Sequence, residues 1–153
     1  QAGPAPASSS STIREHVSAG HLEQAAQLLG RQYSLAGTVV VGDRRGRQLG
    51  FPTANQAPDE GKLVPGRGIY AAVARCGDVV RPAAVSIGIR PQFGGEAESV
   101  EAYLLDFAGD LYGQRLELAF CAKLRDEQRF ASVDLLVAQI GRDVALVRDM
   151  IQL

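Results

Sequence analysis

Short runs of β-branched and apolar residues, separated by turn formers, occupy most of the chain between residues 35 and 120. Thr38–Val41 is one such run, and it lies between two glycines. Further candidate strands follow it at Ile69–Arg75, Val79–Ile87, Val100–Leu105 and Arg115–Phe120. Turn-forming triplets such as Cys76-Gly77-Asp78 and Ala108-Gly109-Asp110 separate the runs. This pattern predicts a small antiparallel barrel or sandwich, because a parallel α/β sheet would need long helices between its strands.

The C-terminal part of the chain has a helical period instead. Apolar residues recur every three or four positions from Val133 to Ile151, which predicts a long amphipathic helix. Ser132 is a good N-cap for this helix, and Asp134 suits the positive end of the helix dipole. We expect the apolar stripe to be core packing that covers an open side of the barrel.

Two shorter helical segments are predicted before the first strand. Thr12 and Glu15 have the spacing of a capping box, and His21–Leu29 has a helical pattern that Gly30 would end. Residues 1–10 are alanine, proline, glycine and serine apart from one glutamine, which predicts a disordered leader. The expected organisation is a leader at 1–10, a helical linker at 11–33 and a single barrel domain at 34–153.

Composition and charge narrow the classes of protein. The 153 residues are 46% apolar, which suits one domain with one core. The net charge of −1 gives no case for binding nucleic acid or an anionic membrane, and no apolar run approaches the ~20 residues that cross a bilayer. The N-terminus lacks the pattern of a signal peptide. Cys76 and Cys121 are far apart and are expected to be reduced and buried, as in a cytoplasmic protein.

The first candidate for chemistry is the glycine- and arginine-rich segment Gly42–Gly50, which includes Gly46 and Arg47. Glycines let the backbone approach a phosphate closely, and arginines add charge-assisted hydrogen bonds. A solvated hairpin loop would use the same residues, so both interpretations stay open here. The chain has no Gly-x-x-x-x-Gly-Lys-Ser/Thr sequence, which excludes an ordinary P-loop.

Thr53 and Asn55 follow directly after this segment and after Pro52. Mg²⁺ prefers oxygen ligands and often takes only a few protein groups together with substrate phosphates. A hydroxyl and a carboxamide are neutral, so the metal would arrive with a nucleotide. The alternative is a simple turn in which Asn55 bonds to its own backbone.

Glu101 lies in the predicted strand Val100–Leu105, where it shares one face with Tyr103 and Leu105. A carboxylate beside a tyrosine on a half-buried face is a candidate general base. A glutamate on the solvent face of an edge strand would have the same local pattern.

Several segments, taken in order, carry a resemblance to a known family. The most specific is Gly46-Arg47-Gln48-Leu49-Gly50-Phe51-Pro52-Thr53-Ala54-Asn55. Later blocks are Gly68–Ala71, Ser86–Gly88, Val100-Glu101, Leu105–Phe107, Asp110–Gly113 and Leu124-Arg125 with Glu127, Phe130 and Ser132. From about Ser10 to Asp149 the chain resembles the riboflavin kinase module of bacterial bifunctional riboflavin kinase/FAD synthetases and, more weakly, the eukaryotic riboflavin kinases. Gln92 and Ala131 depart from the common pattern of this family.

The resemblance implies a mainly β fold, a six-stranded antiparallel Greek-key β-barrel with a C-terminal α-helix. It implies ATP- and Mg²⁺-dependent phosphorylation of riboflavin at its ribityl 5′-hydroxyl, giving FMN and ADP. The position of Glu101 is that of the catalytic base, and those of Thr53 and Asn55 serve the metal. The nucleotide-binding positions are Gly42, Gly46, Arg47, Gly50, Pro52, Thr53, Asn55 and Asp106. The flavin-binding positions are Phe51, Glu101, Arg125, Glu127, Phe130, Ser132 and Asp134.

The N-terminal segments fit the same family. Ser9–Arg14 resembles the end of the adenylyltransferase half of the bifunctional enzymes, and Leu22–Tyr33 resembles the linker that follows it. The catalytic part of that half is not present, so we expect a module of a longer enzyme that does not itself make FAD. The resemblance also allows the full-length enzyme to form oligomers. The competing hypotheses are a non-catalytic flavin- or nucleotide-binding barrel and a module that only assembles oligomers.

Overall fold

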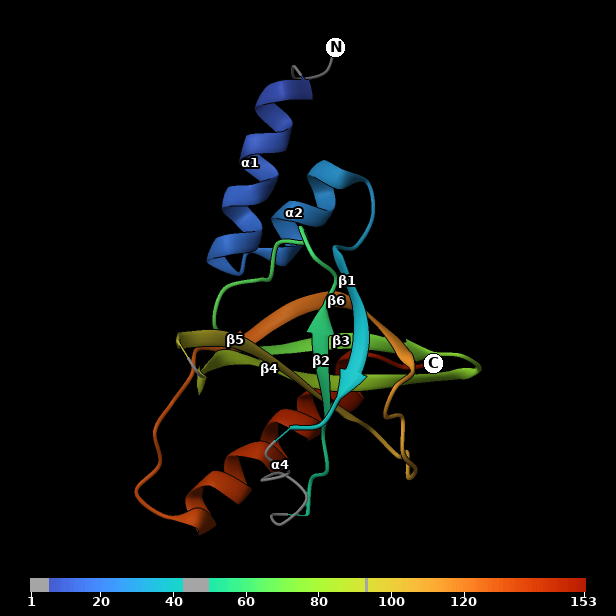
Figure 1. The fold of residues 1–153 in the computed structure, drawn as a ribbon, viewed down its shortest axis with the longest axis vertical. Helices are drawn as coiled ribbons and strands as arrows, with labels where there is room; N and C mark the ends of the chain where they lie inside the picture. Colours follow the sequence, from blue (N-terminus) through green and yellow to red (C-terminus); the bar gives the residue numbers. More distant parts are fainter. Residues whose placement is uncertain (1–5, 43–49, 93) are drawn as a thin grey trace.

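The computed structural model describes residues 6–42, 50–92 and 94–153, and these form one barrel with helices at two of its sides (Figure 1). The elements in chain order are α1 (Pro6–Ala19), α2 (Leu22–Leu29), β1 (Ser34–Val40), β2 (Ala54–Pro58), β3 (Gly68–Cys76), β4 (Val79–Gln92), β5 (Gly95–Leu104), β6 (Arg115–Arg125) and α4 (Val133–Met150). None of the described helices has the length and apolarity needed to cross a bilayer.

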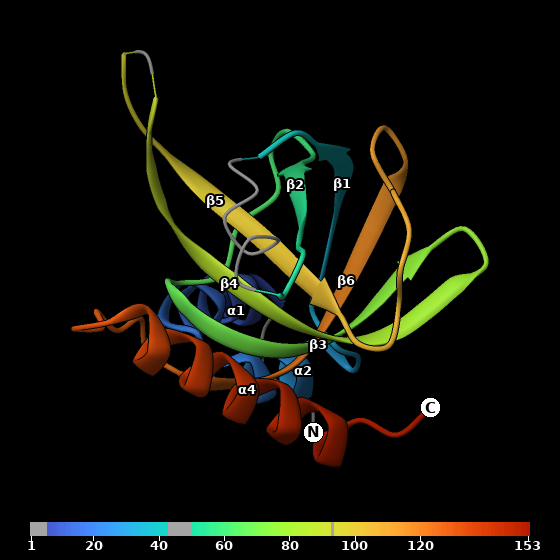
Figure 2. The ribbon, with the colours of Figure 1, turned by 90° about the horizontal axis from the view of Figure 1, so that it is seen from below.

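The six strands close into a barrel in the order β1-β2-β5-β4-β3-β6, and every neighbouring pair is antiparallel (Figure 2). β3, β4 and β5 follow one another as hairpins, and the earlier strand β2 lies beside β5, which is a Greek-key arrangement. The predicted six-stranded antiparallel barrel is therefore confirmed.

The strand β2 is the element that the hydrophobic pattern did not predict. Its sequence Ala54–Pro58 carries the polar residues Asn55 and Gln56 and ends in proline, so it lacks the alternation of a half-buried strand. Tertiary context explains the strand, since it pairs with β1 on one side and with β5 on the other. Gln56 turns into the barrel, where its Nε2 donates to the carbonyl oxygens of Leu35 and Leu116 at 3.1 and 2.8 Å.

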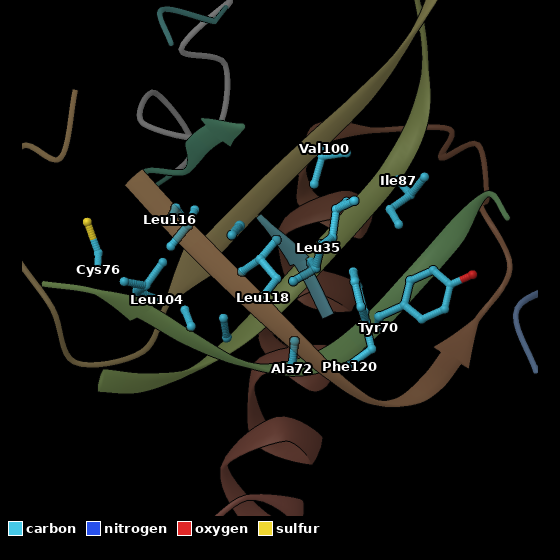
Figure 3. Packing of buried hydrophobic residues seen from close by; sticks show 14 of the residues in the cluster. Leu35, Tyr70, Ala72, Cys76, Ile87, Val100, Leu104, Leu116, Leu118 and Phe120 are labelled. Atoms are coloured by element: carbon cyan, nitrogen blue, oxygen red, sulfur yellow. The ribbon is translucent and has the colours of Figure 1, made fainter. Parts of the chain in front are cut away.

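The barrel interior holds the main hydrophobic core. Figure 3 shows side chains from several strands meeting in this space, among them Leu35, Ile87, Val100, Leu118 and Phe120. Tyr70 packs edge-to-face on Phe120 with ring centroids 5.4 Å apart. Burial raises the pKa of Tyr70 to about 12, so its hydroxyl stays protonated and donates to the Gly66 carbonyl.

The C-terminal helix α4 begins and runs as predicted, but it covers a different surface. Ser132 caps it by accepting a hydrogen bond from the Leu135 N–H at 3.2 Å. The prediction that it covers an open side of the barrel is wrong, because the barrel is closed by the pairing of β1 with β6. Instead α4 lies on the outer face of β3 and β4, where Val147 and Ile151 pack on Ala71.

The N-terminal helices differ from expectation only in where the first one begins. The expected leader spans residues 1–10, whereas α1 already includes Pro6 to Ser10, so that part of the prediction is wrong. Proline suits a first helical turn because its φ is preset and the N–H it lacks would have had no intrahelical partner. As predicted, α2 ends at Gly30, which has a left-handed φ of 77°.

The two cysteines are not bonded to each other, which agrees with the prediction that they are reduced. Cys76 is buried as expected, while Cys121 is only half-buried. Burial raises the pKa of both thiols, which keeps them protonated and weakly reactive.

We predict that Ser132→Ala lowers the free energy of unfolding by about 1 kcal/mol, because the Leu135 N–H loses its capping acceptor. Urea denaturation measures the change. Ser132→Asp is the matched variant, since aspartate also caps helices and should preserve most of the stability. An equal loss in both variants would show that the cap is not what Ser132 contributes.

Candidate functional site

Two cavities meet at one residue, Thr53. The larger cavity has a volume of about 700 Å³ and is walled by β1, β2, β5 and the segment 107–112. The smaller has a volume of about 310 Å³ and lies between the outer face of β3–β5, the segment 125–130 and α4. Thr53 lines both, so a group bound in one cavity is separated from the other by a single side chain.

Cross-strand pairing explains how residues far apart in the sequence reach this place. Asn55 on β2 is opposite Glu101 on β5, which is opposite Ser86 on β4. Ser86 is opposite Ile69 on β3, and Ile69 is opposite Arg125 on β6. Directly opposed residues of antiparallel strands point to the same face, so these five side chains form one row on the outside of the barrel.

Glu101 lies in the middle of the sheet, because β5 pairs with both β2 and β4. The interpretation as an edge-strand residue is therefore wrong. Its neighbours Val100 and Ala102 are buried in the barrel, which fixes the Glu101 carboxylate on the outer face beside the smaller cavity. The Thr53 hydroxyl donates to Glu101 Oε1 at 3.2 Å.

Asn55 belongs to β2 and is only 8% exposed, so the alternative of a simple turn is also wrong. It lines the larger cavity together with Gly42 and Pro52. A Cβ placed on Gly42 would overlap the Asn55 carboxamide, so the absence of a side chain at position 42 is what allows the amide to occupy this wall.

The oxygens available at this boundary suit a metal ion that brings its own anion. The Thr53 hydroxyl uses its proton in the hydrogen bond to Glu101, so the lone pairs of Thr53 Oγ1 point elsewhere and can coordinate a cation. Within the described part of the chain, no group of three or more His, Cys, Asp or Glu side chains is placed to hold a metal ion. Neutral oxygens from Thr53 and Asn55 fit Mg²⁺ only when a bound polyphosphate supplies the negative charge.

The smaller cavity combines aromatic and apolar walls with a few polar groups. Phe51 packs edge-to-face on Tyr103 with ring centroids 5.4 Å apart, and both line the cavity. Glu127 lies over Gly88, since a Cβ at Gly88 would come within 2.8 Å of Glu127 Oε2. Apolar and aromatic walls with a few polar groups are typical of cavities that bind small organic molecules.

Residues from α4 complete the smaller cavity, and the sequence did not indicate them as site residues. Leu136 and Ile140 of the apolar stripe are half-buried and face the cavity, so this part of the stripe is not core packing. Asp143 also lines it and is 3% exposed. The available signal was a charged residue three positions after Ile140 and four before Val147, within the apolar stripe.

The structure brings most of the predicted site residues together. Gly42, Pro52, Thr53 and Asn55 line the larger cavity. Phe51, Glu101, Arg125, Glu127 and Phe130 line the smaller one. Gly46 and Arg47 lie outside the described residues.

Four predicted positions line neither cavity as the structure describes them. Asp106 is exposed and accepts from both terminal nitrogens of Arg148 at 2.6 and 3.1 Å, and this guanidinium holds the pKa of the Asp106 carboxyl below its usual range. Ser132 caps α4, Asp134 is exposed in its first turn, and Gly50 is an exposed turn residue with a φ of 89°. Their ligand contacts remain predictions.

Comparison with known proteins gives consistent matches. The model of the Flavokinase family, described as riboflavin kinase, matches residues 29–151. The bifunctional riboflavin kinase/FMN adenylyltransferase of Escherichia coli K12 is 42% identical over 142 residues, which are 92% of this chain and 45% of that protein. The chain thus spans about half the length of the curated relatives it matches.

Two solved structures share the fold. The crystal structure of riboflavin kinase from Trypanosoma brucei superimposes with a TM-score of 0.58 at 29% identity, covering 76% of this chain and 78% of that one. A crystal structure described as a macrolide-efflux protein from Streptococcus pneumoniae superimposes with a TM-score of 0.86 at 33% identity, covering 91% of this chain and 46% of that one.

We predict that Gly42→Ala lowers the free energy of unfolding by about 1–3 kcal/mol, because the new methyl group displaces the Asn55 carboxamide. Chemical denaturation measures this loss. Gly141→Ala is the matched control: a Cβ there meets no atom within 4 Å, and the position is inside α4, so it should stabilise by about 1 kcal/mol. Full stability in Gly42→Ala would contradict the close packing of Asn55.

Proposed function

Since the chain belongs to the riboflavin kinase family, we propose that it transfers the γ-phosphate of ATP to the ribityl 5′-hydroxyl of riboflavin, giving FMN and ADP. The observation that carries the proposal is the hydrogen bond from Thr53 to Glu101 at the boundary of the two cavities. Phosphoryl transfer needs a donor and an acceptor aligned on either side of one point, and two adjoining cavities offer that arrangement.

The larger cavity suits ATP as the phosphate donor. Its volume of about 700 Å³ is adequate for a nucleotide, and its lining combines apolar side chains such as Val39 and Leu104 with the polar pair Thr53 and Asn55. The triphosphate would extend toward Thr53, and the nucleoside would lie against the segment 107–112. The glycines of the segment Gly42–Gly50 would let its backbone N–H groups approach the phosphates.

The smaller cavity suits riboflavin as the acceptor. The isoalloxazine ring would lie among Phe51, Phe130, Leu136 and Ile140, which offer an apolar and aromatic lining. Glu127 and Arg125 would meet the polar edges of the ring. The ribityl chain would then extend toward Glu101, with its terminal hydroxyl beside Thr53.

Glu101 would act as the general base. As the 5′-hydroxyl oxygen forms its bond to the γ-phosphorus, its proton passes to the Glu101 carboxylate, and the bond from phosphorus to the β–γ bridging oxygen breaks to release ADP. The bond from Thr53 orients the carboxylate before the substrate binds. A base of this kind typically contributes ~10²–10⁴ in rate.

Mg²⁺ would be held by Thr53 Oγ1 and Asn55 Oδ1, and when bound it neutralises charge on the phosphate oxygens. Thr53 and Asn55 then need only position the metal ion, because the phosphates of the nucleotide supply most of the negative charge that balances it. The buried position of Asn55 against Gly42 supports this role, since it restricts the carboxamide to the cavity wall.

We further propose that the chain acts as the kinase part of a longer bifunctional enzyme in the cytoplasm. Its coverage of 45% of the Escherichia coli relative supports the first point, and its unpaired thiols support the second. Riboflavin, FMN, ATP and ADP would be its small-molecule partners.

The direct test is incubation of the protein with riboflavin, ATP and Mg²⁺, followed by chromatographic separation of flavins. FMN should accumulate and FAD should not. Binding of riboflavin and ADP without any FMN would favour a binding module over a kinase.

We predict that Glu101→Gln lowers kcat for FMN formation by about 10²–10⁴ while the protein remains folded, because the amide cannot accept the hydroxyl proton. Chromatography gives the rate, and circular dichroism reports the fold. Glu98→Gln is the matched control, since Glu98 is exposed on the same strand β5 and outside both cavities. Near-normal turnover of Glu101→Gln would remove Glu101 from the mechanism.

We predict that Thr53→Val raises the KM for Mg·ATP by about tenfold, because the isosteric side chain loses the oxygen that faces the cation. Steady-state kinetics over a range of Mg²⁺ concentrations measures the effect. Thr53→Ser keeps the hydroxyl and should stay within about threefold of the parent protein. An unchanged Mg²⁺ requirement in Thr53→Val would count against the metal role.

A further inference from the structure

Asp143 is a buried charged residue in the middle of α4. Its carboxylate oxygens accept hydrogen bonds from Arg125 Nε at 3.0 and 3.1 Å and from Arg125 Nη2 at 2.8 Å. Gln139 Nε2, one turn earlier on α4, donates to the same carboxylate at 3.0 Å. Both side chains of the ion pair are largely shielded, with 17% of Arg125 and 4% of Asp143 exposed.

Stability alone does not account for this pair. Withdrawing two charges from water is unfavourable, and a buried ion pair is often no more stabilising than apolar residues of the same size. The C-terminal half of α4 is already attached to the barrel by apolar packing at Val144 and Val147. The pair can therefore have a role besides fastening the helix.

That role follows from what else the Arg125 guanidinium contacts. Its Nη1 donates to the Asp126 carbonyl at 3.1 Å and to Gln128 Oε1 at 3.4 Å. The same group lies over the Phe130 ring, 5.8 Å from the centroid. One planar cation thus organises the segment 126–130, which leaves β6 and forms one wall of the smaller cavity.

We propose that Asp143 is a positioning residue that fixes the orientation of Arg125 and, through it, the segment 126–130 against the acceptor cavity. The Asp143 carboxylate binds Nε and Nη2 of Arg125. The third guanidinium nitrogen, Nη1, is thereby directed at the segment 126–130. The consequence, which rests on the proposed function, is that Asp143 controls the affinity for riboflavin and not the affinity for ATP.

The first experiment needs no ligand and measures backbone order by ¹⁵N relaxation NMR. Asp143→Asn should lower the order parameters of residues 126–130 to below about 0.6, because Arg125 no longer holds the segment. Val147→Ala, which weakens the packing of α4 away from the cavity, is the control for general destabilisation and should leave these order parameters unchanged. Unchanged order parameters in Asp143→Asn, or the same decrease in both variants, overturn the proposal.

The second experiment measures riboflavin and ADP dissociation constants, the former by quenching of flavin fluorescence, and both KM values. Asp143→Asn should weaken riboflavin binding by about tenfold, while the KM for ATP changes by less than about twofold. The same substitution in an Arg125→Met background should add nothing to the loss of riboflavin affinity, because Asp143 acts through Arg125. Additive effects, or equal losses for both substrates, overturn the proposal.

If Asp143→Asn does not fold, Gln139→Ala replaces it, since this change removes one support of the carboxylate from a half-buried position. It should give the same pattern at about threefold magnitude, and an effect confined to stability would overturn the proposal. Should the parent protein bind riboflavin but form no FMN, the relaxation and binding results still decide the role of Asp143, and only the kinase function fails.

Discussion

Ala54, Asn55 and Gln56 of β2 pair with Ala102, Glu101 and Val100 of β5, and this three-residue contact sets the relation between the two halves of the site. Side chains alternate between the faces of a strand, so the register decides that Asn55 and Glu101 point outward while Gln56 and Val100 point into the barrel. A slip of β2 by one residue would turn the Asn55 carboxamide into the apolar interior and Gln56 outward, and it would move Thr53 away from Glu101. The two hydrogen bonds that the Gln56 side chain donates inside the barrel oppose that slip, because they connect β2 to both β1 and β6.

Closure of the barrel has a second consequence for the site. With the core complete inside the strands, α4 is not needed to close it and is available to form a cavity on the outer face. The helix does this unevenly. Val147 and Ile151 pack tightly on the barrel, whereas Leu136 and Ile140 stand back from it and leave space for a ligand above Glu101 and Ser86. The apolar stripe that looks uniform in the sequence is thus divided between packing and binding.

The sequence predicted those parts of the molecule that depend on local pattern. Five of the six strands follow from β-branched runs between turns, and α4 follows from its period and from the cap at Ser132. β2 could not be predicted from its residues, because its stability comes from pairing with β1 and β5 and not from alternation. The family resemblance led us to expect site roles for Thr53, Asn55 and Glu101, but their distribution over two cavities depends on the pairing of β2 with β5, which the local sequence does not reveal. Asp143 was missed because a charge is ordinarily assigned to the solvent side of a helix, and its partner Arg125 lies on another element.

Two ion pairs connect α4 to the walls of both cavities. Asp143 holds Arg125, where the wall of the smaller cavity begins, and Arg148 holds Asp106, directly before the segment 107–112 that walls the larger cavity. These attachment points are five residues apart, or about 7.5 Å along one rigid helix. A displacement of α4 along its axis would therefore pull on both walls at once. A ligand that displaced α4 would then change the affinity for the second ligand, and the second ligand would change the affinity for the first by the same factor.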